Sequence, residues 1–340
     1  MQRLDFKHRD TPVSLAPGES FYRPMAAGFT DAGAAEMRDL ITAVERGTPW
    51  RDEIERRFGA SKPWLRDVIL SPTRTSFFHL LPARPARILD IGCGWGQMSL
   101  PLAAQGHQVT ALEPGPHRLN FVEAAARQDR LSGQLFFVGA DFLECTFEPL
   151  FDAVLCIGVL EWVGAFGGGH DPQATQRTFL AQIRRSLAPG GTFVIGIENR
   201  IGAKYLLGCP DDHLGVAGVA CLPAKSAIRR WREVSGHALR AFTYSAEELR
   251  DLLRGAGFSR VEFHAAFPDY KLPARIIPVD TDGTAVNDLL RSGIPAREHN
   301  GFDGSALPAD LTERLDAFYR DSARAGVAHA FVPSFFVVGN

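Results

Sequence analysis

Residues 87–96 read Arg-Ile-Leu-Asp-Ile-Gly-Cys-Gly-Trp-Gly. The apolar run from Ala86 to Ile91 is typical of a short buried strand in a parallel sheet, and glycines follow it at positions 92, 94 and 96. Glycine lets the backbone turn tightly there and leaves room for a ligand. Gln97 to Ala104 then predict a helix, whose first N–H groups would be available to a bound group. The stretch therefore predicts a nucleotide-binding turn between a strand and a helix.

The spacing of the glycines decides which nucleotide fits. A dinucleotide-binding turn has the pattern G-x-G-x-x-G, and the sixth position counted from Gly92 is Gln97, which disfavours a nicotinamide dehydrogenase. No G-K-[ST] follows, so the stretch is not a phosphate loop. The pattern Asp-x-Gly-x-Gly-x-Gly, which begins at Asp90, resembles that of the class I methyltransferases that depend on S-adenosylmethionine (SAM). The resemblance implies SAM as the cofactor and places Asp90 near its methionine portion, where a carboxylate suits an ammonium group.

Later segments extend this resemblance at the expected distances. A second apolar strand, His107 to Leu112, ends at Glu113, which the resemblance assigns to the ribose hydroxyls. A third strand, Gln134 to Val138, precedes an acid and an aromatic residue that the resemblance assigns to adenine. A fourth strand, Phe151 to Ile157, would line the cofactor at its end. The implied cofactor-binding residues are Asp90, Gly92, Cys93, Gly94, Gly96, Glu113, Asp141, Phe142 and Ile157.

Each of these residues also has a structural interpretation. Asp90 or Glu113 alone could be an acid at a strand end, Asp141 could start a turn by binding its own backbone, and Phe142 could belong to the core. Glu161 and Trp162 follow the fourth strand, in the segment that faces the acceptor in this family. Trp162 stands where many relatives carry a histidine, so the base expected nearby is missing.

We expect an α/β fold with a doubly wound, mostly parallel, seven-stranded sheet of the Rossmann-like methyltransferase type. Residues 1–84 are expected to form a helical N-terminal extension or lid, with helices over about 31–45, 51–58 and 62–70. Residues 85–197 are expected to form the SAM-binding core, which ends with a fifth strand within Leu187 to Gly196. Residues 198–244 form an insertion on the acceptor side. Residues 245–340 complete the sheet with a helix capped by Ser245, a sixth strand over 260–266, an insertion over 267–330 and a last, antiparallel strand.

The insertion after the fifth strand carries a second group of polar residues. Residues 197–213 read Ile-Glu-Asn-Arg-Ile-Gly-Ala-Lys-Tyr-Leu-Leu-Gly-Cys-Pro-Asp-Asp-His, and residues 268–271 read Pro-Asp-Tyr-Lys. Both resemble segments of a bacterial subgroup of methyltransferases associated with surface polysaccharide and glycan assembly. Open α/β sheets bind ligands at the carboxyl ends of their strands, where this insertion begins. The expected acceptor-binding residues are Glu161, Trp162, Arg200, Lys204, Tyr205 and Tyr270.

Methyl transfer to a hydroxyl benefits from a base, and His213 is the first candidate because its reference pKa is near neutrality. Asp212 or Glu198 could orient this histidine or act alone. His213 could instead make a single structural bond. No metal is expected, because Asp211, Asp212 and His213 are contiguous and neighbouring side chains rarely converge on one ion without ligands from elsewhere.

Composition limits the possible partners and location. The net charge of −2 gives no electrostatic reason to expect nucleic acid, and no apolar run reaches the ~20 residues of a membrane span. The first residues contain no apolar signal segment, and the five cysteines lack C-x-x-C spacing, so we expect a cytoplasmic protein with reduced thiols. Residues 225–234 predict an amphipathic helix with a basic face, which is either solvated or a phosphate-binding surface.

These observations predict a SAM-dependent methyltransferase of a small polar acceptor, with a hydroxyl of a sugar or sugar-like metabolite as the expected target. Methylation of nitrogen or sulfur in a specialised metabolite is an alternative within the same class. A catalytically silent SAM-binding protein is an alternative from another class. The sequence names neither the acceptor nor the oligomeric state.

Overall fold

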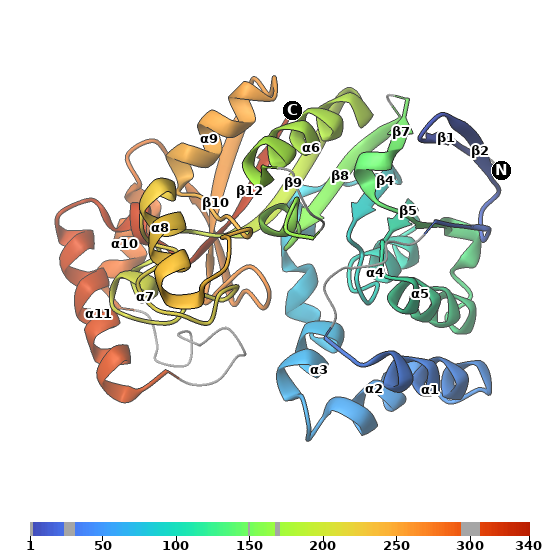
Figure 1. Ribbon diagram of the computed structural model, residues 1–340, viewed down its shortest axis with the longest axis horizontal. Coiled ribbons are helices and arrows are strands. Elements are labelled where there is room, and N and C mark those ends of the chain that lie inside the picture. Colours follow the sequence, from blue (N-terminus) through green and yellow to red (C-terminus); the bar gives the residue numbers. More distant parts are fainter. Residues whose placement is uncertain (1–2, 24–30, 149, 167–170, 294–306) are drawn as a thin grey trace. The chain divides into compact units, whose positions relative to one another are not determined.

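The computed structural model describes residues 3–23, 31–148, 150–166, 171–293 and 307–340 of this chain (Figure 1). The chain divides into two compact units. Unit 1 comprises residues 1–157, 178–194 and 340, and unit 2 comprises residues 158–177 and 195–339.

Unit 1 is built on the parallel sheet that the glycine turn predicts. Its strands are β4 (Arg87–Ile91), β5 (Gln108–Leu112), β6 (Leu135–Gly139) and β8 (Phe151–Ile157), and they lie in the order β8-β4-β5-β6. All pairs between them are parallel. The four expected strands are therefore confirmed, and their near-continuous burial is the pattern of a sheet covered on both faces.

Two helices of unit 1 follow strands of this sheet. α4 (Ser99–Ala104) follows β4, and α5 (Pro116–Gln128) follows β5. α5 buries an apolar stripe that includes Leu119 and Val122, both fully inaccessible. This alternation of strand and helix is the doubly wound arrangement that we expected. α6 (Pro172–Ser186) runs from unit 2 into unit 1, and β9 (Leu187–Glu198) runs from unit 1 into unit 2.

The N-terminal part of unit 1 differs from the expected helical extension. Its helices α1 (Ala34–Glu45), α2 (Trp50–Phe58) and α3 (Pro63–Leu70) agree with the prediction and are followed by the 3₁₀ helix η1 (Pro72–Leu80) (Figure 1). Three short strands precede them, β1 (Leu4–His8), β2 (Thr11–Leu15) and β3 (Ser20–Tyr22). β1 pairs antiparallel with β2 and with β7 (Cys145–Phe147), and β3 pairs parallel with β6. Buried and exposed residues alternate along β1, which is the period of a strand. This strand was not expected from the sequence.

Unit 2 contains an antiparallel arrangement of β10 (Val261–Phe267), β11 (Arg275–Val279) and β12 (Ser334–Gly339), with β10 between the other two. The expected last antiparallel strand is thus confirmed. The strands that were not expected are β1, β2, β3, β7 and β11, so among the described residues the seven predicted strands are accompanied by five more. The remaining helices are α7 (Ala203–Leu206), α8 (Ala224–Ser235), α9 (Ala246–Gly255), α10 (Thr284–Arg291) and α11 (Ala309–Arg324).

Ser245 begins α9 as predicted. Its side chain accepts from the backbone N–H of Glu248, and the Glu248 carboxylate accepts from the backbone N–H of Ser245, which completes a capping box. The division into units differs from the expected domain boundaries, because residues 158–177 group with unit 2 and the change along β9 comes after residue 194. In the part of the chain that the structure describes, no helix combines the length and apolar character needed to cross a membrane.

Candidate active site

The glycine turn after β4 has the backbone conformation that its sequence predicts. Gly92, Gly94 and Gly96 have φ angles of 66°, 57° and 77°, which residues with a side chain rarely adopt. A Cβ atom at Gly96 would lie 3.0 Å from the side chain of Val122, so helix α5 packs closely against the turn. Cys93 is buried, and its N–H donates to the carbonyl of Leu112 over 3.0 Å. The helix begins at Ser99, two residues later than expected.

Asp90 lies at the end of β4 with only 2% of its surface exposed. Its Oδ2 atom accepts a hydrogen bond from Oγ of Ser99 over 2.6 Å. Burial raises the pKa of Asp90 to about 6, although this hydrogen bond and the positive charge of Arg74 oppose the rise. A nearby cation would stabilise the ionised form of this carboxyl, which is what the ammonium group of SAM would provide.

Glu113 binds the backbone of the turn. Its Oε2 accepts from the N–H of Gly94 over 3.0 Å, and its Oε1 accepts from the N–H of Gly115 over 2.9 Å. Burial raises its pKa, while the charge of Arg118 and these two amides lower it. Each oxygen has a second lone pair, so the carboxylate can hold the turn and still accept from hydroxyl groups. Its contact with the ribose stays a prediction.

A set of hydrogen bonds, ion pairs and ring contacts beside the turn was not expected from the sequence. Trp95 is buried, and its Nε1–H donates to Oδ2 of Asp31 over 3.1 Å. Arg118 lies 3.4 Å from the same oxygen and 3.9 Å from Oε2 of Glu113. Trp95 also packs edge-on against Phe58 and Phe121. No sequence pattern links Asp31 to the turn, because only the fold brings the N-terminal segment to this strand end.

Asp141 and Phe142 have the structural roles that the sequence left open as alternatives. Asp141 caps the 3₁₀ helix η3 (Phe142–Glu144), since its Oδ1 accepts from the N–H of Leu143 over 2.9 Å. Phe142 is buried and packs against Phe147 and Phe179. Ile157 is the buried last residue of β8. Contact of these three residues with the cofactor stays a prediction.

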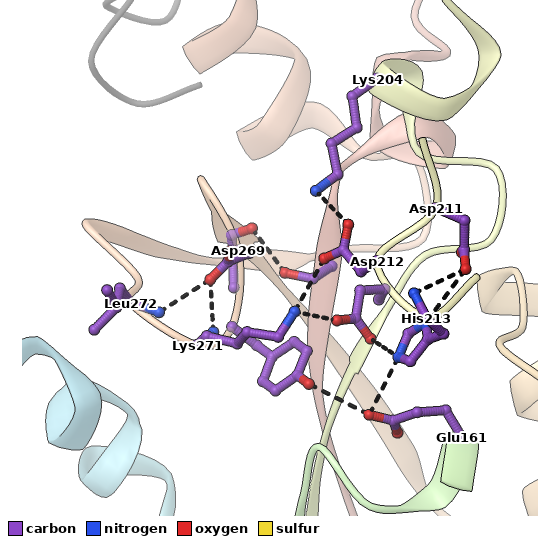
Figure 2. A network of polar contacts seen from close by, with 12 residues as sticks. Glu161, Lys204, Asp211, Asp212, His213, Asp269, Lys271 and Leu272 are labelled. Atoms are coloured by element: carbon purple, nitrogen blue, oxygen red, sulfur yellow. Dashed lines mark hydrogen bonds and ion pairs between the residues drawn. The ribbon is translucent and has the colours of Figure 1, made fainter. Parts of the chain in front are cut away.

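Unit 2 brings the second group of polar residues together in a buried cluster (Figure 2). Glu161 comes from the 3₁₀ helix η4 (Leu160–Trp162), Glu198 ends β9, and His213 lies in the loop that follows α7. The structure thus assembles one carboxylate from the short helix after β8 and one from the end of β9 with a histidine from the insertion. The buried cluster consists of Glu161, Glu198, Lys204, Asp211, Asp212, His213, Asp269 and Lys271.

His213 lies between carboxylates and is almost inaccessible, with 5% of its side chain exposed. Its Nε2 atom is 3.7 Å from Oε1 of Glu161 and 3.5 Å from Oε2 of Glu198, and its Nδ1 atom is 3.7 Å from Oδ1 of Asp211. Burial by itself lowers the pKa of His213, but the charge of Glu198, together with Asp211 and Glu161, raises it well above its usual value. The carboxylate neighbours of His213 therefore favour its protonated, imidazolium form.

Glu161 is equally buried and shows the opposite effect of burial. Desolvation raises the pKa of Glu161, and the charge of Glu198 adds to the rise, while His213 opposes it. The hydroxyl of Tyr270 lies 3.4 Å from Oε1 of Glu161. The Oε2 atoms of Glu161 and Glu198 are buried, and within the described residues neither accepts a hydrogen bond. Two carboxylate oxygens are therefore desolvated without a hydrogen bond, which is costly unless a ligand or ion completes them.

Asp212 forms hydrogen bonds with two lysines and none with His213 among those of the described residues. Its Oδ1 atom accepts hydrogen bonds from Nζ of Lys204 over 3.2 Å and from the hydroxyl of Tyr205 over 3.0 Å. Its Oδ2 atom accepts from Nζ of Lys271 over 3.0 Å. Burial opposes ionisation, but the charges of Lys271 and Lys204 outweigh it and hold the pKa of Asp212 well below its usual range. Lys271 also donates to Oε1 of Glu198 over 2.5 Å. Lys204 and Tyr205, expected at the acceptor, thus contact Asp212 in the interior.

Two further acids shape the backbone around the cluster. Oδ1 of Asp211 accepts from the N–H groups of His213 and Leu214. Oδ1 of Asp269 accepts from the N–H groups of Lys271 and Leu272 in the same way, as Figure 2 shows. These turns fix the positions from which His213 and Lys271 enter the cluster. Lys271 was visible in the Pro-Asp-Tyr-Lys segment, but only its neighbour Tyr270 was singled out.

A small pocket of about 40 Å³ in unit 2 reaches the cluster, because its lining includes Asp211 and His213 together with Arg200 and Tyr244. Arg200 is bound to the Glu248 carboxylate through two nitrogens, each over 2.9 Å. The ring of Trp162 packs edge-on against that of His213, with 5.1 Å between centroids. Of the residues expected at the acceptor, Arg200 therefore lines a pocket, whereas Trp162 supports the histidine.

Comparison with known proteins relates this geometry to a family. Residues 89–195, from β4 to β9, match the family described as "Methyltransferase domain". A ubiquinone biosynthesis O-methyltransferase of Methylobacterium nodulans is 31% identical over 198 residues, which cover 52% of this chain and 73% of that protein. The chain belongs to the class I SAM-dependent methyltransferases. The expected fold, enzyme class and cofactor are thus confirmed.

Two further proteins match different shares of this chain. A ubiquinone biosynthesis O-methyltransferase of Rickettsia akari is 30% identical over 121 residues. The match covers 36% of this chain and 43% of that protein, so this chain spans less than half of that relative's length. A solved structure of phosphoethanolamine N-methyltransferase 2 from Haemonchus contortus, in complex with SAM, aligns with a TM-score of 0.47 and 15% identity over 88% of this chain and 59% of that chain. These names give no support to the expected glycan-assembly subgroup.

The residues of unit 1 fit the SAM that this methyltransferase family uses. The buried Asp90 carboxyl lacks a full countercharge, and Glu113 has acceptor capacity left beside the turn. A side chain at Gly94 would meet the Gln97 amide at 3.4 Å and would require a strained backbone. We therefore predict that Asp90 binds the amine of the cofactor and that Glu113 binds its hydroxyls.

Proposed function

We propose that this methyltransferase transfers the SAM methyl group to a hydroxyl oxygen of a small polar acceptor. The observation that carries the proposal is the buried cluster of unit 2, in which Glu161 and Glu198 face His213. A hydroxyl is a weak nucleophile until its proton is removed, whereas a free amine or a thiolate needs no strong base. Burying several charges is costly, and titratable groups with shifted pKa values that are buried together are candidates for proton transfer. The O-methyltransferase names of the relatives support the same choice.

Bound SAM supplies a methyl carbon on a positively charged sulfur, so transfer breaks the carbon–sulfur bond, forms a carbon–oxygen bond and leaves the electron pair on sulfur. The hydroxyl proton must then pass to the protein. We assign this proton to Glu161, because burial raises the pKa of its carboxyl and makes it a stronger base than a solvated glutamate.

The other two candidates from the sequence act differently in this proposal. Glu198 and the other carboxylate neighbours of His213 raise its pKa against the effect of burial. In this proposal His213 is therefore a protonated partner that offsets carboxylate charge. Asp212 is a weak base because Lys271 and Lys204 lower its pKa against the effect of burial. Glu198 remains the second possible proton acceptor, since its Oε2 atom receives no hydrogen bond from the described residues.

The pocket beside the cluster supports a polar acceptor. Its lining combines Arg200, Thr243 and Tyr244 with Leu239 and Phe242, and its volume of about 40 Å³ admits the hydroxyl-bearing end of an acceptor and not a whole molecule. A sugar or sugar-like acceptor therefore remains our proposal. The cytoplasmic location expected from the sequence also stays a prediction.

The test uses the purified chain, SAM and acceptors in matched sets that differ only in the reacting atom. Each set contains an alcohol, the corresponding amine and the corresponding thiol on one scaffold, with sugars and phenols as separate scaffolds. Formation of S-adenosylhomocysteine with the alcohols supports the proposal. Turnover restricted to amines or thiols supports the alternative acceptors. SAM binding without turnover on every scaffold favours a silent SAM-binding protein.

A further inference from the structure

Three side chains of the buried cluster have the chemistry of metal ligands. Glu161, Glu198 and His213 each offer one ligand atom, and these atoms all lie within 4.8 Å of one another. The sequence analysis expected no metal because Asp211, Asp212 and His213 are contiguous. The structure instead joins His213 to two glutamates from distant parts of the chain. Asp211 and Asp212 point to other partners, the loop backbone and the lysines.

The distances fit ligands of one ion better than hydrogen bonds. Nε2 of His213 lies 3.7 Å and 3.5 Å from the nearest oxygens of Glu161 and Glu198. Both values are too long for a hydrogen bond. Metal–ligand bonds of about 2.1 Å place two ligands of a tetrahedral ion about 3.4 Å apart, which is close to both distances from His213. The oxygens of the two glutamates lie within 4.8 Å of each other and would move closer around an ion.

Two independent observations indicate a missing positive charge. Oε2 of Glu161 and Oε2 of Glu198 are buried, and the described residues offer neither a hydrogen bond. The carboxylates of the buried cluster also outnumber its two lysines, and a single proton on His213 leaves negative charge in excess. A divalent cation would displace the proton from His213, because only the neutral imidazole is a ligand, and it would remove more of this excess than the proton does.

The surroundings of the three ligands resemble the outer partners of metal sites. Asp211 lies beside Nδ1 of His213, Tyr270 beside Oε1 of Glu161, and Lys271 donates to Oε1 of Glu198. Such partners fix the orientation of ligands and tune their basicity. The pocket that includes His213 in its lining offers a path for an ion.

We propose that Glu161, Glu198 and His213 bind one divalent metal ion. Two carboxylates and one imidazole form a mixed oxygen and nitrogen donor set, which suits Mn²⁺ or Zn²⁺ and leaves coordination positions open. An acceptor hydroxyl in an open position would lose its proton more readily because the ion stabilises the alkoxide. That role rests on the proposed function, whereas binding of the ion does not.

The experiment measures metal binding on the whole chain without SAM or acceptor. Protein stripped with a chelator and dialysed is titrated with Mn²⁺ and, separately, with Zn²⁺ by calorimetry, and bound Mn²⁺ is counted by the loss of its free paramagnetic signal. We expect one site per chain. Glu161→Gln and His213→Ala should each weaken binding at least ~10-fold, by loss of a ligand.

Two control variants carry the same chemistry outside the buried cluster. Glu262→Gln alters an exposed glutamate that pairs with Arg260, and His237→Ala removes an exposed histidine, so both should bind the ions as the unaltered chain does. Absence of saturable binding of both ions overturns the inference, as does unchanged affinity in both ligand variants. Either result leaves the proposed O-methylation intact, because turnover is measured separately on chelator-treated protein.

Discussion

Nε2 of His213 lies 3.5 Å from Oε2 of Glu198, a buried oxygen to which the described residues donate no hydrogen bond. A histidine that acted alone as a base would need a free lone pair at neutral pH. Here the charge of Glu198, with Asp211 and Glu161, raises the pKa of His213 despite the opposing effect of burial. This relationship is why we propose a glutamate, and not His213, as the proton acceptor.

The first prediction concerns Glu161, the second glutamate that faces His213. Glu161→Gln should leave SAM affinity unchanged and lower turnover of a hydroxyl acceptor by about 10²–10⁴, the usual contribution of a positioned proton acceptor. Calorimetry with SAM and single-turnover kinetics separate the two quantities. Glu262→Gln serves as the control, because this glutamate is exposed on β10. Full activity of Glu161→Gln would exclude this carboxylate as the proton acceptor, and Glu198 would be tested next.

The second prediction concerns pH and the cofactor. In the SAM-free protein, burial raises the pKa of Asp90 to about 6, with the Ser99 hydrogen bond and Arg74 opposing the rise and Glu113 adding to it. The cationic cofactor stabilises the ionised form, so the pKa of Asp90 is lower in the complex. SAM binding must then release a proton below pH ~6, and affinity should fall by up to about tenfold per pH unit there.

Calorimetry at pH 5, 6 and 7.5 checks this sign. In Asp90→Asn the side chain does not titrate, so its SAM affinity should be lower at pH 7.5 and should change little between pH 5 and 7.5. A steep pH dependence that persists in this variant would show that another group is responsible.

The third prediction concerns Glu113, whose oxygens accept from the N–H groups of Gly94 and Gly115. Glu113→Gln replaces one acceptor oxygen by a donor and removes charge-assisted hydrogen bonds worth about 1.5–3 kcal/mol. We expect SAM affinity to fall by about one to two decades and the melting temperature to fall as well, because the turn loses an anchor. Glu45→Gln is the control, since Glu45 is exposed and pairs with Arg127. Unchanged SAM affinity with reduced stability would limit Glu113 to a structural role.

The fourth prediction concerns Gly158, which directly follows β8. Its φ angle is +72°, and a Cβ atom would lie 2.7 Å from the buried hydroxyl of Tyr270. Gly158→Ala should destabilise the protein by about 1–2 kcal/mol for the backbone conformation alone, and further through displacement of Tyr270. Denaturant unfolding measures the loss.

The double variant Gly158→Ala/Tyr270→Phe separates the two causes. Removal of the hydroxyl should recover the part of the loss that arises from the clash and leave the part that arises from φ. No recovery would show that the whole cost lies in the backbone. A Gly158→Ala variant as stable as the unaltered chain would contradict both.

The sequence predicted the parallel strands and the glycine turn of unit 1 because these features are local. Apolar runs, glycine spacing and the acids at the strand ends repeat within short windows, and each can be recognised without knowing what packs against it. The same holds for α9, whose capping box is written in four consecutive residues. The strands β1 and β3 were missed because they are short and find their partners, β7 and β6, far along the chain.

The buried cluster shows what only the tertiary structure decided. The sequence indicated His213, Glu198, Glu161 and Asp212 as residues of interest, but their pairing depends on which loops meet. Asp212 is adjacent to His213 in the chain and yet binds Lys204 and Lys271, while Glu161 and Glu198 come from elsewhere to the histidine. Charge and pKa depend on distance and burial in three dimensions, which the chain order does not contain. The residue types were thus determined by the sequence, whereas the contacts, burial and charges on which their proposed roles rest were decided by the fold that buries them together.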